Sequence, residues 1–599
     1  MSLVDQAAAE GYGAWNPGLE SELPHELLPL ATVFRPENVS TSLAQAFELS
    51  DCCGLPPQEL VAFRPERLII HELLVRVTAD LAVPDGTTYE DLGRNFREIA
   101  ATILDKHVAP HADELEQRFA QVRGEAAAFV ARQLASLAGS QPAPAAVAGD
   151  PGRRRWFGLT RRSRQAVPTE SAEQRERRII LEWSTQAESA ASRLEQSCFR
   201  ALSTIATAIT ARRGRLFADR ALLTDLAVMQ VANDFGSEAI GDAMAAFIDE
   251  ATRREGFRPL SAQQHPVILN VKGASASGKS TMRPLQRALA RKLGFPWENF
   301  ALISPDIWRK FLLDYGSLGS AYKYAGTMTG HEIEIVDKKL DRHMARKWAK
   351  GEVSHLLIDR FRFDSFVEGQ EPKRLLTRFA DLVYMFFIVT PPEMTVERAW
   401  RRGLQVGRYK AVEDLLAHNV EAYTGMPELF FTWALDGRRR VHYEFLDNSV
   451  AEGSPLTIAF GWNTEMTIVD IKRMLDIDRF RKINIRAQTP QDVYAGLDLA
   501  PERNVDFLQR CARLIPAINF VDRATGRAYA RLERGRWTWR DEAHIARIAD
   551  PDVKAAIQAL RADGPGAAEP ERPADALLDR SHNLGAWNEG AKVAEAASC

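Results

Sequence analysis

VILNV at residues 267–271, followed by GASASGKST at residues 273–281, is the stretch of sequence that decides the fold. The first segment is a short apolar run typical of a buried parallel strand. The second fits the pattern G-x-x-x-x-G-K-[ST], in which glycines let a loop turn so that its N–H groups surround phosphate oxygens. MRPLQRALARKLG (282–294) predicts a helix whose N-terminus favours the same anion. This order of strand, loop and helix predicts a nucleotide-binding α/β domain.

The predicted phosphate loop assigns a role to each of its polar residues. We expect Lys279 to reach the β- and γ-phosphates of ATP, and Ser280 to supply a hydroxyl ligand to Mg²⁺. The predicted ATP-binding residues are Gly273, Ala274, Ser275, Ala276, Ser277, Gly278, Lys279, Ser280 and Thr281.

A second apolar run, FALIS (300–304), leads into PDIWR (305–309). Asp306 and Arg309 are three residues apart, so they share one face of a predicted helical turn. That turn lies at the carboxyl edge of the expected parallel sheet, where ligands bind. We expect Asp306 to accept the proton of a substrate hydroxyl while Arg309 holds the acceptor. An aspartate in a first helical turn is also favoured by the helix dipole alone, so a purely structural role stays open.

Two further segments complete the predicted site. HLLID (355–359) is an apolar strand ending in Asp359, a layout typical of a group that holds Mg²⁺ or its water. Asp359 could equally be a loop aspartate, or pair with Arg360 or Arg362. ERAWRRGLQVGR (397–408) places Arg402 and Arg408 beside glycines, as in a mobile lid that neutralises transition-state charge. A solvated basic helix end explains the same arginines.

Together these segments resemble a zeta-toxin-type P-loop kinase domain over about residues 264–470. The resemblance is carried by GASASGKST, SPDIWR, YKYAGTMTGHEIEIV, LLIDRFR, ERAWRRGLQVGR and FLDNS. It implies that Lys279 and Ser280 bind ATP–Mg²⁺ and that Asp306 is the base. The acceptor and lid roles that it implies fall on Arg309, Glu332, Arg402 and Arg408, with Arg398 as a further lid candidate.

The sequence departs from the family's pattern at two places. The family often has Pro-Gly where this chain has Ser275 and Ala276, and the segment after SPDIWR lacks the family's His-Pro. Because that second region shapes the acceptor pocket, the family's nucleotide-sugar acceptor is one possibility among small molecules.

The remaining sequence surrounds this domain with helical and mixed regions. The expected fold class is an α/β P-loop kinase domain with a parallel sheet, preceded by a mostly α-helical N-terminal region and followed by a small mixed α/β module. The predicted boundaries are a helical region at 1–137, a flexible basic linker at 138–169, a helical region at 170–260, the kinase domain at 261–470, the small module at 471–563 and a disordered tail at 564–599.

Composition narrows the classes of partner. The chain has 599 residues and a formal net charge of −3, and this charge argues against nucleic acid as a partner. Its five cysteines are too few for a disulfide framework. Neither a signal peptide nor a membrane-length apolar run is present, so we expect a cytoplasmic protein. The word GAWN occurs at 13–16 and again at 585–588, and these segments or the helical N-terminal region are candidate docking sites for a protein partner.

Three functions remain open from the sequence. The leading one is an ATP- and Mg²⁺-dependent kinase that phosphorylates a hydroxyl of a small molecule. A polynucleotide 5′-kinase has a similar layout, and the arginines of the predicted linker would then contact nucleic acid. An ATP-gated scaffold would bind nucleotide without acceptor chemistry. The sequence identifies neither the acceptor nor the oligomeric state.

Overall fold

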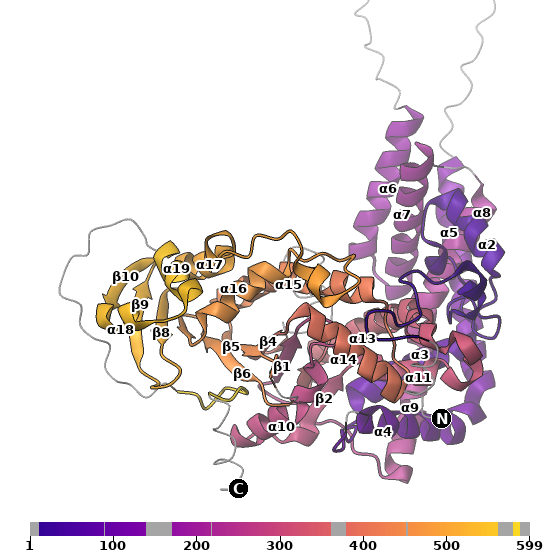
Figure 1. Ribbon diagram of the computed structural model, residues 1–599. Coiled ribbons are helices and arrows are strands. Elements are labelled where there is room, and N and C mark those ends of the chain that lie inside the picture. The colour runs from indigo at the N-terminus through magenta and orange to yellow at the C-terminus, as the bar shows by residue number, and fades with distance from the viewer. Residues whose placement is uncertain are drawn as a thin grey trace, which may run out of the picture. The chain divides into compact units, whose positions relative to one another are not determined.

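A computed structural model describes residues 11–88, 90–138, 171–216, 219–360, 379–450, 453–560 and 579–587. The chain divides into two compact units (Figure 1). The first, here called the sheet unit, comprises Met1–Ala31, Leu74–Ile103 and Glu250–Cys599. The second, here called the helical unit, comprises Thr32–Leu73 and Leu104–Asp249. Apart from Ala138, the predicted basic linker lies outside the described residues.

The sheet unit is built on one ten-stranded sheet, counted over the described residues. Its spatial order is β10-β9-β8-β7-β6-β5-β4-β1-β3-β2. The strands are β1 (Val267–Lys272), β2 (Phe300–Ile303), β3 (His355–Ile358), β4 (Leu382–Val389), β5 (Arg440–Asp447), β6 (Leu456–Trp462), β7 (Glu465–Ile468), β8 (Ala517–Val521), β9 (Ala528–Glu533) and β10 (Arg536–Arg540). The first five strands pair in parallel, whereas β6 is antiparallel to both β5 and β7.

Helices pack on both faces of this sheet. Their bounds are α4 (Asp91–Ile103), α10 (Arg283–Lys292), α11 (Arg309–Leu312), α12 (Ala325–Met328), α13 (Gly330–Lys350), α14 (Pro392–Val406), α15 (Val412–Ala434), α16 (Ile471–Phe480), α17 (Asp506–Leu514), α18 (Glu542–Arg547) and α19 (Pro551–Ala559). Figure 1 shows α10 on one side of the strands and α15 and α16 on the other.

The apolar strand sequences explain why both faces are covered. Val267 and Leu269 of β1 share a buried cluster with Leu289 of α10. Alternate residues point to the opposite face, where the ring of Phe387 contacts the ring of Phe430 from α15. Central strands buried on both faces need continuous apolar runs rather than alternating ones, and the sequence has such runs.

The observed sheet differs from the expected parallel sheet at its far side. The parallel order is confirmed for β1 to β5, but β6 and β7 are antiparallel. Strands β8 to β10, expected in a separate small module, extend the same sheet because β8 pairs in parallel with β7. Without β8, the edge of β7 that faces away from β6 would present a row of unpaired backbone groups. Pairing with β8 satisfies these groups.

Residues 579–587, which fall in the predicted disordered tail, pack on β6. The backbone N–H of Thr457 donates to the carbonyl of Ala586 at 3.0 Å, and the N–H of Ala586 donates to Pro455 at 2.9 Å. Trp587 is buried against Phe460, and its indole N–H donates to the carbonyl of Arg523 at 2.7 Å. This part of the second GAWN word therefore packs inside the sheet unit rather than serving as a free docking peptide.

The first GAWN word is also packed within the chain. Trp15 contacts a buried cluster that includes Val396 and Leu415, and its indole N–H donates to Glu397 at 3.2 Å. Trp15 is half-buried in this position, and the prediction that the word contacts a protein partner stays a prediction.

Residues 74–103 belong to the sheet unit, although the sequence placed them in a continuous helical region. Helix α3 (Pro65–Asp80) ends in Asp80, which pairs with Lys347 of α13 at 2.6 Å. The indole N–H of Trp308 donates to Thr78 at 3.1 Å. These buried contacts fix the segment that precedes α4 beside the strand ends.

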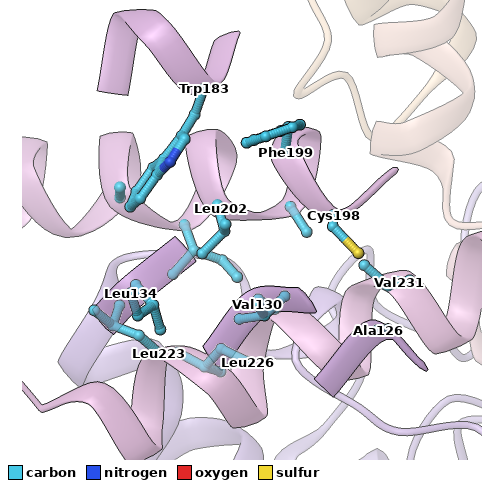
Figure 2. Packing of buried hydrophobic residues seen from close by; sticks show 14 of the residues in the cluster. Ala126, Val130, Leu134, Trp183, Cys198, Phe199, Leu202, Leu223, Leu226 and Val231 are labelled. Atoms are coloured by element: carbon cyan, nitrogen blue, oxygen red, sulfur yellow. The ribbon is translucent and has the colours of Figure 1, made fainter. Parts of the chain in front are cut away.

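The helical unit consists mainly of packed helices. They are α2 (Leu43–Cys53), α5 (Ala112–Ala138), α6 (Ala172–Ser189), α7 (Arg193–Arg213) and α8 (Arg220–Val231), with α3 and α9 (Ser237–Glu255) each shared between the units. Figure 2 shows Val130, Leu202 and Leu226 meeting beneath Trp183 in its core. Across the described part of the chain, no helix combines the length and the hydropathy needed to span a membrane.

Candidate nucleotide and acceptor site

The candidate site lies where the five parallel strands end. β1 is central, with β3 and β2 on one side and β4 and β5 on the other. The chain therefore leaves β1 toward one half of the sheet and returns to the other half at β4. In open α/β sheets a ligand binds at such a switch point, outside the carboxyl ends of the strands. The segment that follows β1 is loop 273–278.

The loop conformation depends on its two glycines. Gly278 has a φ of 98°, and a Cβ built there would lie 2.2 Å from Nδ2 of Asn448. At Gly273 a Cβ would lie 2.6 Å from Oγ of Ser277. Ala276 has a positive φ of 59°, a conformation that costs an alanine about 1 kcal/mol.

Three side chains hold the end of the loop through one carbonyl group. The carbonyl oxygen of Ser277 accepts hydrogen bonds from Asn448 at 2.7 Å, from Thr390 at 3.1 Å and from Arg398 at 3.2 Å. Thr390 follows β4 and Asn448 follows β5, so the loop is attached to the two neighbouring strand ends. Sequence reasoning assigned no role to Thr390 or Asn448, although FLDNS marks the end of β5.

Lys279 begins the 3₁₀ turn Lys279–Met282 that leads into α10. Its ammonium group donates to the carbonyl of Gly273 at 3.0 Å and to that of Ala274 at 2.9 Å, so the side chain folds back over the loop. Burial lowers the pKa of Lys279, whereas the charges of Asp359 and Asp306 raise it. Asp359 and Asp306 therefore both lie within electrostatic reach of Lys279.

Ser280 and Asp359 lie in direct contact after β1 and β3. The hydroxyl of Ser280 donates to Oδ2 of Asp359 at 3.2 Å. Mg²⁺ binds through one or two protein oxygens together with substrate phosphates, and this pair of oxygen ligands beside the loop fits that pattern. No cluster of three or more His, Cys, Asp or Glu ligands occurs among the described residues, so a metal held by protein alone is not indicated there.

Arg360, which follows Asp359, pairs elsewhere. Its guanidinium is 4% exposed and contacts Asp337 at 2.6 Å and Asp341 at 2.7 Å on α13. The backbone N–H of Asp359 donates to the carbonyl of Ile303 of β2 at 2.9 Å. Arg362, the other candidate partner of Asp359, lies outside the described residues.

Asp306 is bound by two arginines. Nε of Arg309 lies 2.8 Å from Oδ1 and Nη2 of Arg408 lies 2.6 Å from Oδ2. The Asp306 side chain is 47% exposed, and the charges of Arg408, Arg309 and Arg402 hold the pKa of its carboxyl group well below the usual range. Asp306 is accordingly an ionised carboxylate, poised between the segment after β2 and the segment after α14.

The remaining predicted residues are placed around this carboxylate. Arg402, in α14, is half-buried and its positive charge acts on both Lys279 and Asp306. Arg309 also donates to the hydroxyl of Thr329 at 2.7 Å, immediately before α13. Glu332 is buried in the first turn of α13.

A small cavity of about 30 Å³ opens beside Asp306. Its described lining is Glu90, Gly93, Arg97, Arg283, Ser304, Asp306, Ile307, Arg309, Lys310, Tyr315 and Arg408, and Glu332 is not part of that lining. Glu90, Gly93 and Arg97 come from α4 and the residue before it. Sequence reasoning missed them because they lie about 200 residues before Asp306 along the chain.

No family model, curated protein or solved structure matches this chain.

Proposed function

We propose that this protein is an ATP-dependent phosphotransferase that moves the γ-phosphate of ATP to a hydroxyl of a small molecule. The observation that carries the proposal is the convergence of a phosphate-type loop, an oxygen pair suited to Mg²⁺ and an arginine-bound carboxylate at the ends of parallel strands. Lys279, Asp359 and Asp306 are electrostatically coupled, and each follows a different strand. A nucleotide-binding scaffold would not need the third of these elements.

The residues divide the reaction between them. Loop 273–278 and the start of the following helix bind the phosphates through backbone N–H groups, and Lys279 supplies a positive charge to them. Ser280 and Asp359 would hold Mg²⁺, which would supply positive charge to the phosphates when bound. Asp306 orients the acceptor hydroxyl and accepts its proton, while Arg402 and Arg408 neutralise negative charge on the transferred group.

The depressed pKa of Asp306 makes it a weak base. That is compatible with phosphoryl transfer, whose loose transition state depends more on positioning than on proton abstraction. Arg408 bonds to the carboxylate that the acceptor would need, so we propose that acceptor binding displaces Arg408 from Asp306. ATP is the phosphate donor in this proposal. A nucleotide sugar remains one candidate acceptor.

The test is phosphate transfer from γ-labelled ATP to a metabolite extract, with the labelled product identified by mass spectrometry. Lys279→Ala should lower transfer by about a hundredfold or more, because it removes a fixed electrostatic contact to the phosphates. Lys292→Ala is the matched control, since Lys292 is exposed in the last turn of α10. Transfer by Lys279→Ala at the rate of the control would refute the site, and no labelled product with wild-type protein would refute the function.

A further inference from the structure

We infer that the acceptor carries a phosphate group, and that Arg97 of α4 binds it together with Arg283 of α10. That the bound molecule is an acceptor rests on the proposed function. The anion subsite itself is a property of the cavity beside Asp306. Arg97 lies outside the part of the chain that resembles a kinase, so it would be a specificity-determining residue that this chain adds.

The cavity lining is strongly basic. It contains five cationic side chains, Arg97, Arg283, Arg309, Lys310 and Arg408, and two carboxylates, Glu90 and Asp306. Asp306 is shared by Arg309 and Arg408, and Glu90 pairs with Lys310 at 3.2 Å. The excess of positive charge is therefore concentrated at Arg97 and Arg283.

Arg283 is the stronger indication of an absent anion. Its side chain lines the cavity although the residue is only 6% exposed. Its Nε is buried and has no hydrogen-bond partner among the described residues. A buried guanidinium donor without a hydrogen-bond partner is costly.

Arg97 is placed by a glycine one turn before it on α4. A Cβ at Gly93 would lie 3.2 Å from Nη1 of Arg97 and 3.9 Å from Ile307. Glycine is unfavourable by about 1 kcal/mol inside a helix, and here it makes room for the guanidinium beside the segment that carries Asp306. Burial lowers the pKa of Arg97 while Glu90 raises it.

Two guanidinium groups in a small cavity fit a phosphate better than a neutral hydroxyl. Arginine presents paired N–H donors that match phosphate oxygens, and charge-assisted bonds of this kind are about twice as strong as neutral ones. The cavity of about 30 Å³ lies beside the Arg408–Asp306 pair, so it suits one small group of a compact acceptor. A polynucleotide chain would need an open, extended groove.

The first experiment measures anion binding without turnover. Inorganic phosphate is titrated by calorimetry into the full chain saturated with Mg²⁺ and a non-hydrolysable ATP analogue. We expect Arg97→Gln and Arg283→Gln each to weaken phosphate binding by roughly tenfold to a hundredfold, as for loss of a charged hydrogen bond. Arg94→Gln is the matched control, because Arg94 lies on the same helix, is 67% exposed and does not line the cavity.

Equal phosphate affinity in Arg97→Gln and Arg94→Gln would overturn the subsite. Failure of the analogue to bind, seen in its own titration, would instead refute the proposed function, and the phosphate titrations would still report on Arg97. In the second experiment the extract is separated by anion exchange before labelling. The acceptor should be found in the anionic fraction, and nuclease treatment should not destroy it. An acceptor in the neutral fraction, or an acceptor that nuclease destroys, would overturn the assignment.

Discussion

Replacing Gly278 by alanine should weaken nucleotide binding strongly, because the loop has no room for a Cβ at that position. The φ of 98° is rarely adopted by residues other than glycine, and the built Cβ would lie 2.2 Å from Nδ2 of Asn448 and 3.2 Å from Oγ1 of Thr281. Asn448 is fully buried and donates to Ser277 at 2.7 Å, so it cannot move without losing that bond.

The magnitude follows from these two costs. Backbone strain at such a φ costs on the order of 1–3 kcal/mol. Loss of the Asn448 hydrogen bond adds about 1 kcal/mol. If the loop of the variant relaxes in the absence of nucleotide, it avoids both costs, and nucleotide binding must then supply the free energy to restore the binding conformation. The combined cost of about 2–4 kcal/mol corresponds to roughly a thirtyfold to thousandfold weaker Kd.

Calorimetry with Mg²⁺ and a non-hydrolysable ATP analogue measures this effect. Gly294→Ala is the control, because Gly294 also has a positive φ, of 79°, but no atom lies within 4 Å of its built Cβ. Gly294→Ala should lose stability without losing nucleotide affinity. Wild-type affinity in Gly278→Ala would show that loop 273–278 is not the nucleotide site.

Two further predictions concern the attachment of residues 579–587 to the sheet. Trp587→Ala should lower the free energy of unfolding by about 3–5 kcal/mol, since it empties a buried site and removes the bond to Arg523; hydrogen exchange in 584–587 that matches wild type would contradict this. Burial raises the pKa of Glu444 to about 7, although this carboxylate accepts bonds from the N–H groups of Leu584 and Gly585. The folded state then binds this proton more tightly than the unfolded chain, so its stabilising contribution is complete below pH 4.5 and falls by about 3 kcal/mol as the pH rises to about 7. Urea unfolding at both pH values should show a weaker pH dependence for Glu444→Gln than for wild type, and an unchanged dependence would rule out this carboxyl as the source.

The sequence predicted the local features of the site because each depends on a few consecutive residues. VILNV forms β1, Lys279 begins the turn after the loop, and Asp306 meets Arg309 across one helical turn. The sequence assigned both Ser280 and Asp359 to Mg²⁺, but their direct contact depends on the pairing of β1 with β3, which the sequence did not predict.

The features that the sequence did not predict depend on contacts between distant segments. Nothing in the sequence around Arg97 indicates that α4 packs beside Asp306. The pairing of β8 with β7 likewise depends on which strand edge is left open, and an apolar run alone does not show its partner. Trp587 was placed in a disordered tail because the tail begins with the Pro-, Gly- and Ala-rich stretch GPGAAEPERPADALLD (564–579), although its own ring is buried.

The central claim is that Asp306 acts on an acceptor after ATP has bound, and one variant tests it most directly. In Asp306→Asn, nucleotide affinity by calorimetry should stay near wild type, whereas phosphate transfer from γ-labelled ATP to the acceptor fraction should fall by roughly a hundredfold to ten-thousandfold. Transfer at the wild-type rate would reduce Asp306 to a structural partner of Arg309 and Arg408. Loss of nucleotide binding in the same variant would place Asp306 in the nucleotide or metal site and contradict its role as the base.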